Sequence, residues 1–367
     1  MKIAYFLGAL NRGGAETLIL DICRQHVNVP YEFVCVYRHD GNMSDEFKAS
    51  GAPMLHIPKN GGVMHYIWQV RKTLLHERIT IVHSQTPSNT LILAIALIGT
   101  GIKIITTFHG HTFAPAPWWK RKVVYAASEK ILCVSRYEKS YYEKMWGLPK
   151  ENKLEVVYNG VDFSKIEDCR LKIEDLQLQN EGRNRLCMVG NFVSGRSQFV
   201  VCKALQKLRV KSEELRVDWD FYFIGRRDDK QAYLYDECVR YCEEHHLNNV
   251  HFLGSRNDVP ELLKTMDGFV YSTVHDTFGI AVIEAIASGL PVVVNDWDVM
   301  IEVCGDANEG IRYFKTENVE DAADKIADLL ANLESSKKVA EANAKRVKEK
   351  YSIQKHMENL YEIYSHL

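Results

Sequence analysis

The chain has 367 residues, a length that suits two domains of about 150 residues each better than one core. Hydrophobic residues make up 46% of it and charged residues 26%, which excludes a natively disordered protein. The formal net charge is −2, but residues 1–165 carry an excess of Lys and Arg, and the remainder carries an excess of Asp and Glu. The basic half could attract anionic lipids or a phosphorylated acceptor, or the charge could simply be spread unevenly over a solvated surface. Beyond residues 118–122 no aromatic-rich basic stripe occurs, which argues against nucleic-acid binding.

The N-terminal sequence predicts no targeting segment. Residues 1–8 contain only a short apolar run and lack the cleavage site of a signal peptide. The longest apolar stretch, residues 91–98, is far shorter than the ~20 residues that cross a bilayer. The nine cysteines form no disulfide framework, and a zinc site within residues 238–246 is disfavoured because its Cys and His residues share one helix without a second ligand cluster. We therefore predict a cytoplasmic protein with reduced thiols.

Short apolar runs alternate with amphipathic segments of helix length in both halves of the chain, which predicts two parallel α/β sheets. In the first half we expect strands at residues 3–7, 33–37, 54–57, 79–83, 103–108, 130–134 and 154–158. In the second half we expect them at residues 186–189, 219–224, 250–253, 268–271 and 291–294. Ligands of open α/β sheets bind beyond the carboxyl ends of the strands, so the site is expected in a cleft between the two domains.

A glycine pair follows the first strand. Gly13 and Gly14 precede a helix expected over residues 17–24. Glycine lets backbone amides approach an anion closely, and the positive end of a helix favours negative charge. Such pairs also occur in ordinary turns, so this one alone is weak evidence.

A histidine stands at the end of the fifth strand. His109, followed by Gly110, could reach a ligand there, although an isolated histidine at a strand end is structural more often than catalytic. The next segment, residues 113–125, mixes Trp with Lys and Arg. This mixture suits contact with an anionic membrane, and it also suits a half-buried helix start.

Residues 162–185 read as a linker because they contain many charges, no strand-like run and a turn-prone sequence at 180–184. The second half then opens with a strand that leads into Gly190, Asn191 and Arg196, ahead of a helix that starts near Gln198. The planar guanidinium of Arg196 can contact phosphate oxygens in pairs, which suits a diphosphate.

The densest pattern covers residues 272–294 and comprises a strand end, a loop, a helix and the next strand. Gly279 opens the helix, so the amides of Phe278, Gly279 and Ile280 can point toward phosphate. Asp276 precedes this helix and Glu284 follows eight residues later, and the two carboxylates could hold different sugar hydroxyls. An ordinary αβ unit explains an acidic residue near a helix start, but it does not explain the mid-helix Glu284 among apolar neighbours.

After residue 318 the sequence is helical in pattern, with a break and a new helix start at residues 351–354. We predict a Rossmann-like domain over residues 1–165, a second one over residues 166–350, and a C-terminal helix over residues 351–367 that packs back toward the first domain.

Five segments resemble, in order and spacing, the motifs of the retaining glycosyltransferases of family 4. This family has the GT-B fold, in which two Rossmann-like parallel-sheet domains face each other across a cleft. The segments are the glycine loop at 13–16, the histidine motif at 109–110, the Asn-Gly-Val-Asp sequence at 159–162, the phosphate motif at 189–196 and the paired acidic residues at 276–284. Each match alone is weak, but the five together cover nearly the whole chain.

The resemblance implies a role for each matched residue. The amide of Gly14 would contact the donor phosphate, Arg196 would neutralise the diphosphate in place of the family's lysine, and Glu284 would hold the ribose hydroxyls. His109 would lie beside the transferred sugar, and Asp276 would bind its hydroxyls. The implied donor-binding residues are Gly13, Gly14, Gly190, Asn191, Arg196, Phe278, Gly279, Ile280 and Glu284, and the implied catalytic residues are His109, Asp276 and Arg196. No metal or other cofactor is implied, because Arg196 and helix amides can stabilise the leaving diphosphate.

Two positions depart from the family pattern. The first glutamate of the acidic pair is Asp276 here, and the arginine two residues into the phosphate motif is Asn191. The shorter carboxylate could change the sugar preference or mark weakened catalysis. We favour a changed preference because the other motifs survive.

The resemblance thus predicts an acceptor-side first domain and a donor-binding second domain. The predicted reaction moves a sugar, with retention, from a nucleoside diphosphate sugar, with a UDP-sugar favoured, to a glycan or lipid-linked glycan acceptor in surface polysaccharide biosynthesis. A lipid-linked acceptor would place this cytoplasmic protein at the inner face of the cell membrane. One alternative is a nucleotide-sugar epimerase of the same fold, against which the glycine loop argues. Another is a catalytically silent sugar-nucleotide-binding or glycan-binding protein, which only Asp276 and Asn191 support.

Overall fold

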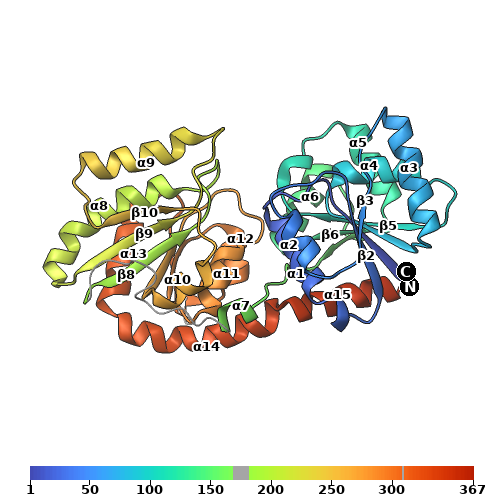
Figure 1. Ribbon diagram of the computed structural model, residues 1–367. Coiled ribbons are helices and arrows are strands. Elements are labelled where there is room, and N and C mark those ends of the chain that lie inside the picture. The colour runs from blue at the N-terminus through green and yellow to red at the C-terminus, as the bar shows by residue number, and fades with distance from the viewer. Residues whose placement is uncertain (168–181, 308–309) are drawn as a thin grey trace. The chain divides into compact units, whose positions relative to one another are not determined.

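The computed structural model describes residues 1–167, 182–307 and 310–367, and it divides into two compact units (Figure 1). The first unit comprises residues 1–161 and 353–367, and the second comprises residues 162–352. The C-terminal helix therefore belongs to the first unit, and the boundary falls after Val161. Most of the predicted linker, including residues 180 and 181 of the expected turn, lies outside the described residues.

The first unit is built on a parallel sheet of seven strands in the order β3-β2-β1-β4-β5-β6-β7. The strands are β1 (Lys2–Phe6), β2 (Glu32–Tyr37), β3 (Met54–His56), β4 (Ile81–Ser84), β5 (Lys103–Phe108), β6 (Lys130–Cys133) and β7 (Leu154–Val156). All seven predicted strands are present, and their ends differ from the prediction by no more than two residues.

Helices cover both faces of this sheet. They are α1 (Gly14–Arg24), α2 (Ser44–Ala49), α3 (Val63–His76), α4 (Pro87–Ala96), α5 (Trp118–Ala127), α6 (Arg136–Trp146) and α15 (Ile353–Ser365). Because successive strand residues point to opposite faces, Ile3 and Tyr5 pack with α1, α2 and α15, whereas Ala4 and Phe6 pack with α3 and α4. From Ile3 to Phe6 the central strand β1 is buried on both faces, which explains the apolar sequence of these four residues.

The C-terminal helix α15 is anchored to the end of the first unit's sheet. The Ile353 amide donates to the Val161 carbonyl oxygen at 3.0 Å. A Cβ atom added to Gly160 would lie 2.7 Å from His356 Cβ, so only glycine permits this close approach. Asp162 Oδ1 accepts the Ser164 amide at 3.2 Å and starts the short helix α7 (Ser164–Glu167). The Asn-Gly-Val-Asp sequence therefore joins the end of one unit to the start of the other.

The second unit is built on a parallel sheet of six strands in the order β10-β9-β8-β11-β12-β13. The strands are β8 (Asn184–Val189), β9 (Trp219–Ile224), β10 (Val250–Gly254), β11 (Gly268–Tyr271), β12 (Val292–Asn295) and β13 (Ile311–Phe314). The edge strand β13 was not predicted from the sequence. It is short and carries Arg312, whose guanidinium pairs with Asp328 at 2.6 Å.

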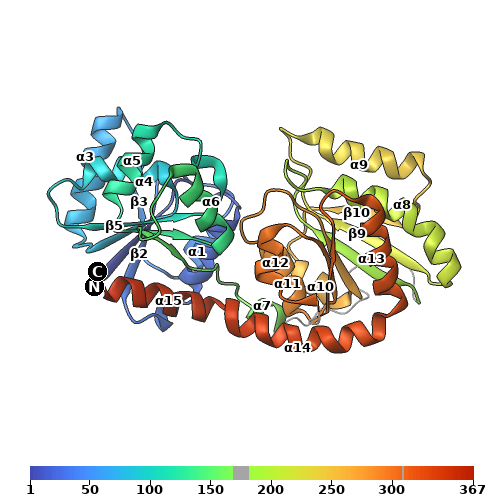
Figure 2. The same cartoon turned by 180° about the vertical axis from the view of Figure 1, so that it is seen from behind.

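The helices of the second unit also form two layers. They are α8 (Gln198–Leu215), α9 (Ala232–Glu244), α10 (Val259–Thr265), α11 (Ile280–Ala287), α12 (Asp298–Cys304), α13 (Val319–Ala331) and α14 (Leu333–Tyr351). Helix α8 contacts both α9 and α13 on one side of the sheet, and α11 contacts both α12 and α14 on the other (Figures 1 and 2). Across the three described ranges, none of the helices combines the length and the apolar character that a membrane crossing requires.

Candidate active site

The loop between β11 and α11 is held in one shape by the neighbouring strand. Asn295, at the end of β12, accepts the Thr273 amide at 2.9 Å and donates to the Thr273 carbonyl oxygen at 2.8 Å. The hydroxyl of Thr273 in turn accepts the amide of Asp276 at 3.2 Å. This chain of contacts fixes the backbone of Asp276 at the carboxyl edge of the second sheet.

Both carboxylate oxygens of Asp276 have partners. Oδ1 lies 3.0 Å from Nη2 of Arg196, and Oδ2 accepts a hydrogen bond from the Tyr271 hydroxyl at 2.5 Å. Burial raises the pKa of the Asp276 carboxyl, and the positive charge of Arg196 opposes that shift. The first acidic residue of the predicted pair thus orients Arg196 through a nearly buried ion pair.

Arg196 is confined by its surroundings. Its Cζ atom lies 5.2 Å from the centroid of the Tyr271 ring, within the range of a cation–π contact. A Cβ atom on Gly190 would lie 3.1 Å from Nη1 of Arg196. Gly195 has a φ of +89°, and a Cβ atom there would lie 2.4 Å from His275 Cβ. The two glycines therefore make room for the guanidinium and for the loop that carries it.

Asn191, one of the two departures from the family pattern, stabilises the turn after β8. Its side-chain oxygen accepts the Arg226 amide at 3.0 Å, and its carbonyl oxygen accepts a hydrogen bond from Gln198 at 3.1 Å. The same turn lies very close to Gly225, because a Cβ atom on Gly225 would lie 2.0 Å from the Gly190 carbonyl oxygen. Gly225 was not among the residues predicted from the sequence, although its place directly after β9 was a signal for such a close approach.

Helix α11 begins beside this cluster. Its N-cap, Gly279, has a φ of 82°, and a Cβ atom there would lie 2.7 Å from Met300 Cε. The first amides of a helix have no acceptor within the helix, so those of Ile280 and Ala281 can receive an anion, whereas the Val282 amide already donates to the Gly279 carbonyl oxygen at 3.1 Å. The Phe278 ring is buried and packs edge-on against Tyr351 at 5.4 Å, so only the backbone of Phe278 remains a candidate for donor binding.

Glu284 lies in the middle of α11 and is partly exposed, whereas its neighbours Ile283 and Ala285 are fully buried. The helix therefore presents one carboxylate from an otherwise apolar segment. Arg196, Asp276, the start of α11 and Glu284 all belong to the second unit and follow its strands β8 and β11.

Gly13 and Gly14 occupy the corresponding position in the first unit. Gly13 is the N-cap of α1 with extended backbone, and the helix begins at Gly14, three residues earlier than predicted. Gly14 therefore lies in the first turn, where amides have no intrahelical acceptor. Glu16 lies in the same turn, and burial raises the pKa of its carboxyl.

His109 lies directly after β5 in the first unit. Its Nε2 atom lies 3.0 Å from Oε1 of Gln85. Burial lowers the pKa of His109 to about 3, and the nearby His356 adds to the shift. At neutral pH His109 is therefore an uncharged imidazole that can exchange hydrogen bonds with a ligand but cannot supply a positive charge.

Two further buried histidines belong to this region. His83 contacts the Tyr364 hydroxyl through Nδ1 at 2.6 Å, and Nδ1 of His356 lies 2.7 Å from the Tyr158 carbonyl oxygen. Burial lowers the pKa of His356 to about 4 and holds that of His83 well below its usual range.

These histidines predict a loss of stability in acid. A histidine whose pKa is lower in the folded state takes up its proton mainly on unfolding, so its stabilisation is complete above about pH 6.5 and falls as the pH drops below that value. Each group can remove up to ~1.4 kcal/mol per pH unit. We expect the urea midpoint to fall between about pH 7 and pH 5, and His356→Gln should reduce that fall more than His76→Gln, because His76 lies on the surface. An equal pH dependence in the two variants would contradict this account.

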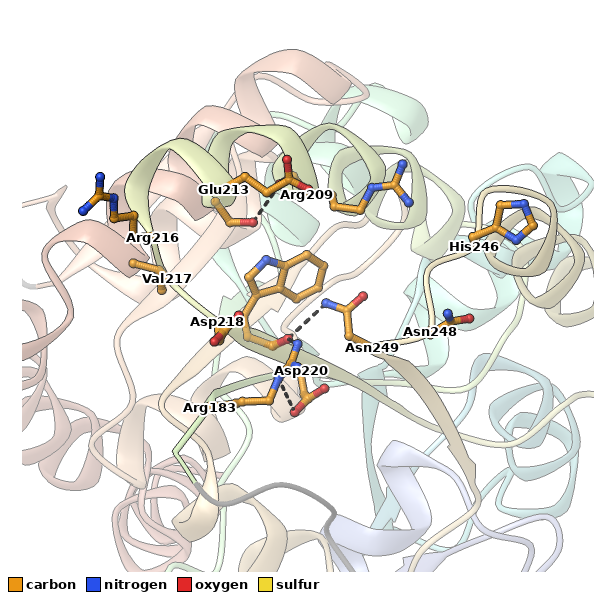
Figure 3. A pocket seen from close by; sticks show the side chains of 12 residues that line it. Arg183, Arg209, Glu213, Arg216, Val217, Asp218, Asp220, His246, Asn248 and Asn249 are labelled. Atoms are coloured by element: carbon orange, nitrogen blue, oxygen red, sulfur yellow. Dashed lines mark hydrogen bonds and ion pairs between the residues drawn. The ribbon is translucent and has the colours of Figure 1, made fainter.

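No group of three or more His, Cys, Asp or Glu residues suited to hold a metal ion occurs in residues 1–167, 182–307 and 310–367, the 238–246 segment included. A hollow of ≈ 530 Å³ does occur in the second unit, and Trp219 is among its lining residues. Figure 3 shows Arg183, Asp220 and Asn249 from the same lining. The hollow lies at the amino ends of β8, β9 and β10, opposite the edge where the strands lead into Arg196 and Asp276. This hollow is therefore separate from the candidate site.

Comparison with known families covers most of the chain. Residues 12–165 match the family model described as Glycosyltransferase Family 4, and residues 171–346 match the one described as Glycosyl transferases group 1. The first match contains Gly13, Gly14 and His109, and the second contains Arg196, Asp276 and Glu284.

Individual glycosyltransferases also resemble this chain over most of its length. The O-antigen biosynthesis glycosyltransferase WclY of Escherichia coli is 22% identical over 83% of this chain and 82% of its own. The UDP-Gal:alpha-D-GlcNAc-diphosphoundecaprenol alpha-1,3-galactosyltransferase of Escherichia coli is 26% identical over 61% of this chain and 60% of its own. The crystal structure of Anabaena Alr3699/HepE in complex with UDP and glucose has a TM-score of 0.85 and 17% identity, and the match covers 100% of both chains.

Proposed function

Since this chain is a glycosyltransferase with the GT-B fold, we propose that it is a retaining enzyme of family 4 whose donor is a nucleoside diphosphate sugar. The observation that carries this proposal is the cluster of Arg196, Asp276 and Tyr271 beside the N-terminus of α11, the helix that also bears Glu284. A guanidinium and helix amides suit a diphosphate, and a partly exposed carboxylate suits the hydroxyls of a ribose.

The proposed donor is a UDP-sugar, and the proposed acceptor is a glycan or lipid-linked glycan of a surface polysaccharide. The UDP bound in the Anabaena protein supports uracil as the base of the donor nucleotide. The names of the two Escherichia coli relatives support a polysaccharide role, and one of them specifies a diphosphoundecaprenol acceptor.

In the proposed reaction the acceptor hydroxyl attacks the anomeric carbon from the face that the diphosphate leaves. The new carbon–oxygen bond forms as the bond to the diphosphate breaks, and the acceptor proton passes to a diphosphate oxygen. Arg196 and the α11 amides stabilise the charge that develops on the leaving group, so no metal is required. Neutral His109 would donate or accept a hydrogen bond beside the transferred sugar.

The geometry of Asp276 refines its proposed role. Because Arg196 and Tyr271 already engage both of its carboxylate oxygens, Asp276 would act chiefly by positioning the guanidinium. The shortened side chain then suits the distance to Arg196, which replaces the family's lysine.

The experiment that tests this function is a survey of nucleotide sugars. The purified chain is incubated with UDP-, GDP- and ADP-sugars in the presence of a metal chelator, and release of the nucleoside diphosphate is followed. We expect release from a UDP-sugar that persists with the chelator. Binding of a nucleotide sugar without release would favour a silent binding protein, and interconversion of sugars without release would favour an epimerase.

A further inference from the structure

Helices α3, α4 and α5 lie in one layer of the first unit, which α6 completes, and α4 is in contact with both α3 and α5 (Figures 1 and 2). Their sequences contain no Asp or Glu. They contain five basic residues, which are Arg71, Lys72, Lys120, Arg121 and Lys122. These three helices therefore carry a net positive charge and no carboxylate of their own. The nearest acidic residues along the chain, Glu77 and the exposed Glu129, follow the ends of α3 and α5.

The outer side of the same layer exposes large apolar side chains. The exposed ones in α3, in α5 and in or just after α4 are Val63 53%, Met64 72%, Trp68 53%, Leu75 45%, Ile95 51%, Ile98 69%, Trp118 63% and Trp119 50%. In α3, the residues Met64, Trp68, Lys72 and Leu75 recur every three or four positions and so share one side of the helix. The opposite side of α3 packs into the core.

Each exposed tryptophan in this layer carries a lysine over its ring. The ammonium of Lys72 lies 5.1 Å from the centroid of Trp68. Lys122 lies 5.1 Å from Trp118 and Lys120 lies 5.4 Å from Trp119 in the same way. Indole rings prefer the boundary between hydrocarbon and water, and lysines placed beside them can reach phosphate headgroups.

We propose that the outer face of α3, α4 and α5 binds the surface of an anionic lipid bilayer. An anionic surface attracts cations at ~1 kcal/mol each, and a carboxylate on the contacting face would oppose that attraction. The apolar side chains are spread over three helices, which suits a fluid, extended headgroup layer better than the compact centre of a protein interface.

The proposal revises the membrane segment expected from the sequence. Of residues 113–125, Phe113 and Ala114 are buried, so they cannot contribute to the contact, and the exposed tryptophans of this segment belong to α5. Trp68 and its neighbours on α3, together with Ile95 and Ile98, enlarge the surface beyond that segment. The proposal does not depend on the proposed reaction, although a lipid-linked acceptor would be delivered to the same surface.

Co-sedimentation of the full chain with vesicles tests this surface, without donor or acceptor. We expect binding to vesicles that contain phosphatidylglycerol and little binding to pure phosphatidylcholine. The double variant Lys72→Glu, Lys122→Glu should lower the partition coefficient by about tenfold or more. The matched control is Lys338→Glu, Lys345→Glu, which makes the same charge change at exposed positions of α14 and should leave binding unchanged.

A second pair of variants addresses the apolar part of the contact. Trp68→Ala with Trp118→Ala should weaken the binding that persists in high salt, because salt screens only the electrostatic part. The proposal is overturned if anionic vesicles do not bind the chain, or if both lysine pairs reduce binding equally. It is also overturned if the parent chain self-associates in size-exclusion chromatography and the variants abolish that self-association but still bind vesicles. The face would then join two copies of the chain. Nucleotide release without vesicles reports separately on the proposed reaction.

Discussion

Replacement of Arg196 by alanine is expected to lower kcat/KM for sugar transfer by about 10² to 10³. The guanidinium is the proposed counter-charge for the leaving diphosphate, and it is held in place by Asp276 at 3.0 Å and by the ring of Tyr271 at 5.2 Å. Most of the loss should appear in kcat, because charge on the diphosphate grows as the bond to the sugar breaks. Steady-state rates of nucleoside diphosphate release measure the effect.

The control for this variant is Arg312→Ala. Arg312 has a side-chain exposure of 16% and an ion pair with Asp328, so its loss removes a comparable contact of the second unit away from the proposed donor site. The control should retain the catalytic constants of the parent. Equal losses in both variants would mean that Arg196 acts only through stability. If Arg196→Ala kept full activity, Arg196 would not be part of the donor site.

Replacement of Glu284 by alanine is expected to weaken binding of the nucleoside diphosphate by about 10- to 100-fold. Hydrogen bonds to a charged acceptor contribute ~1.5–3 kcal/mol, and the proposed ribose contact would lose its carboxylate. The change should appear in the dissociation constant of UDP, measured by calorimetric titration, because UDP retains the ribose and lacks the sugar.

Glu261→Ala serves as the matched control for Glu284→Ala. Glu261 is a partly exposed helical carboxylate of the same unit, in the first turn of α10. Its variant should bind UDP as the parent does. If Glu284→Ala also bound UDP with unchanged affinity, the ribose assignment would be wrong.

Most of the strands could be predicted from the sequence because a strand buried on both faces leaves a largely apolar run. β5, β9 and β11 were predicted with their observed bounds, because their residues are mostly apolar, aromatic or β-branched even though β9 includes Asp220. β13 was missed because it is an edge strand of four residues with Arg312 inside it. The start of α1 was placed too late because glycine is a poor helix former, although Gly14 is tolerated in a first turn.

The candidate site was only partly readable from the sequence. Glu284 could be selected because a charge among apolar helix neighbours is unusual, whereas Arg196 and Asp276 were selected from their places between a strand end and the next helix. Tyr271 could not be selected, because a tyrosine at the end of a buried strand reads as core, and only the structure brings its hydroxyl 2.5 Å from Asp276. The pairing of Asp276 with Arg196 joins two loops that are 80 residues apart, which no local pattern predicts.

The most direct test of the central claim is the configuration of the sugar that the enzyme releases. With the UDP-α-sugar that gives the fastest nucleotide release, the slow hydrolysis that occurs without acceptor can be followed by proton NMR before the free sugar mutarotates. The account predicts that the α-anomer of the free sugar appears first, together with UDP. First appearance of the β-anomer would contradict a retaining transfer from the face of the leaving diphosphate.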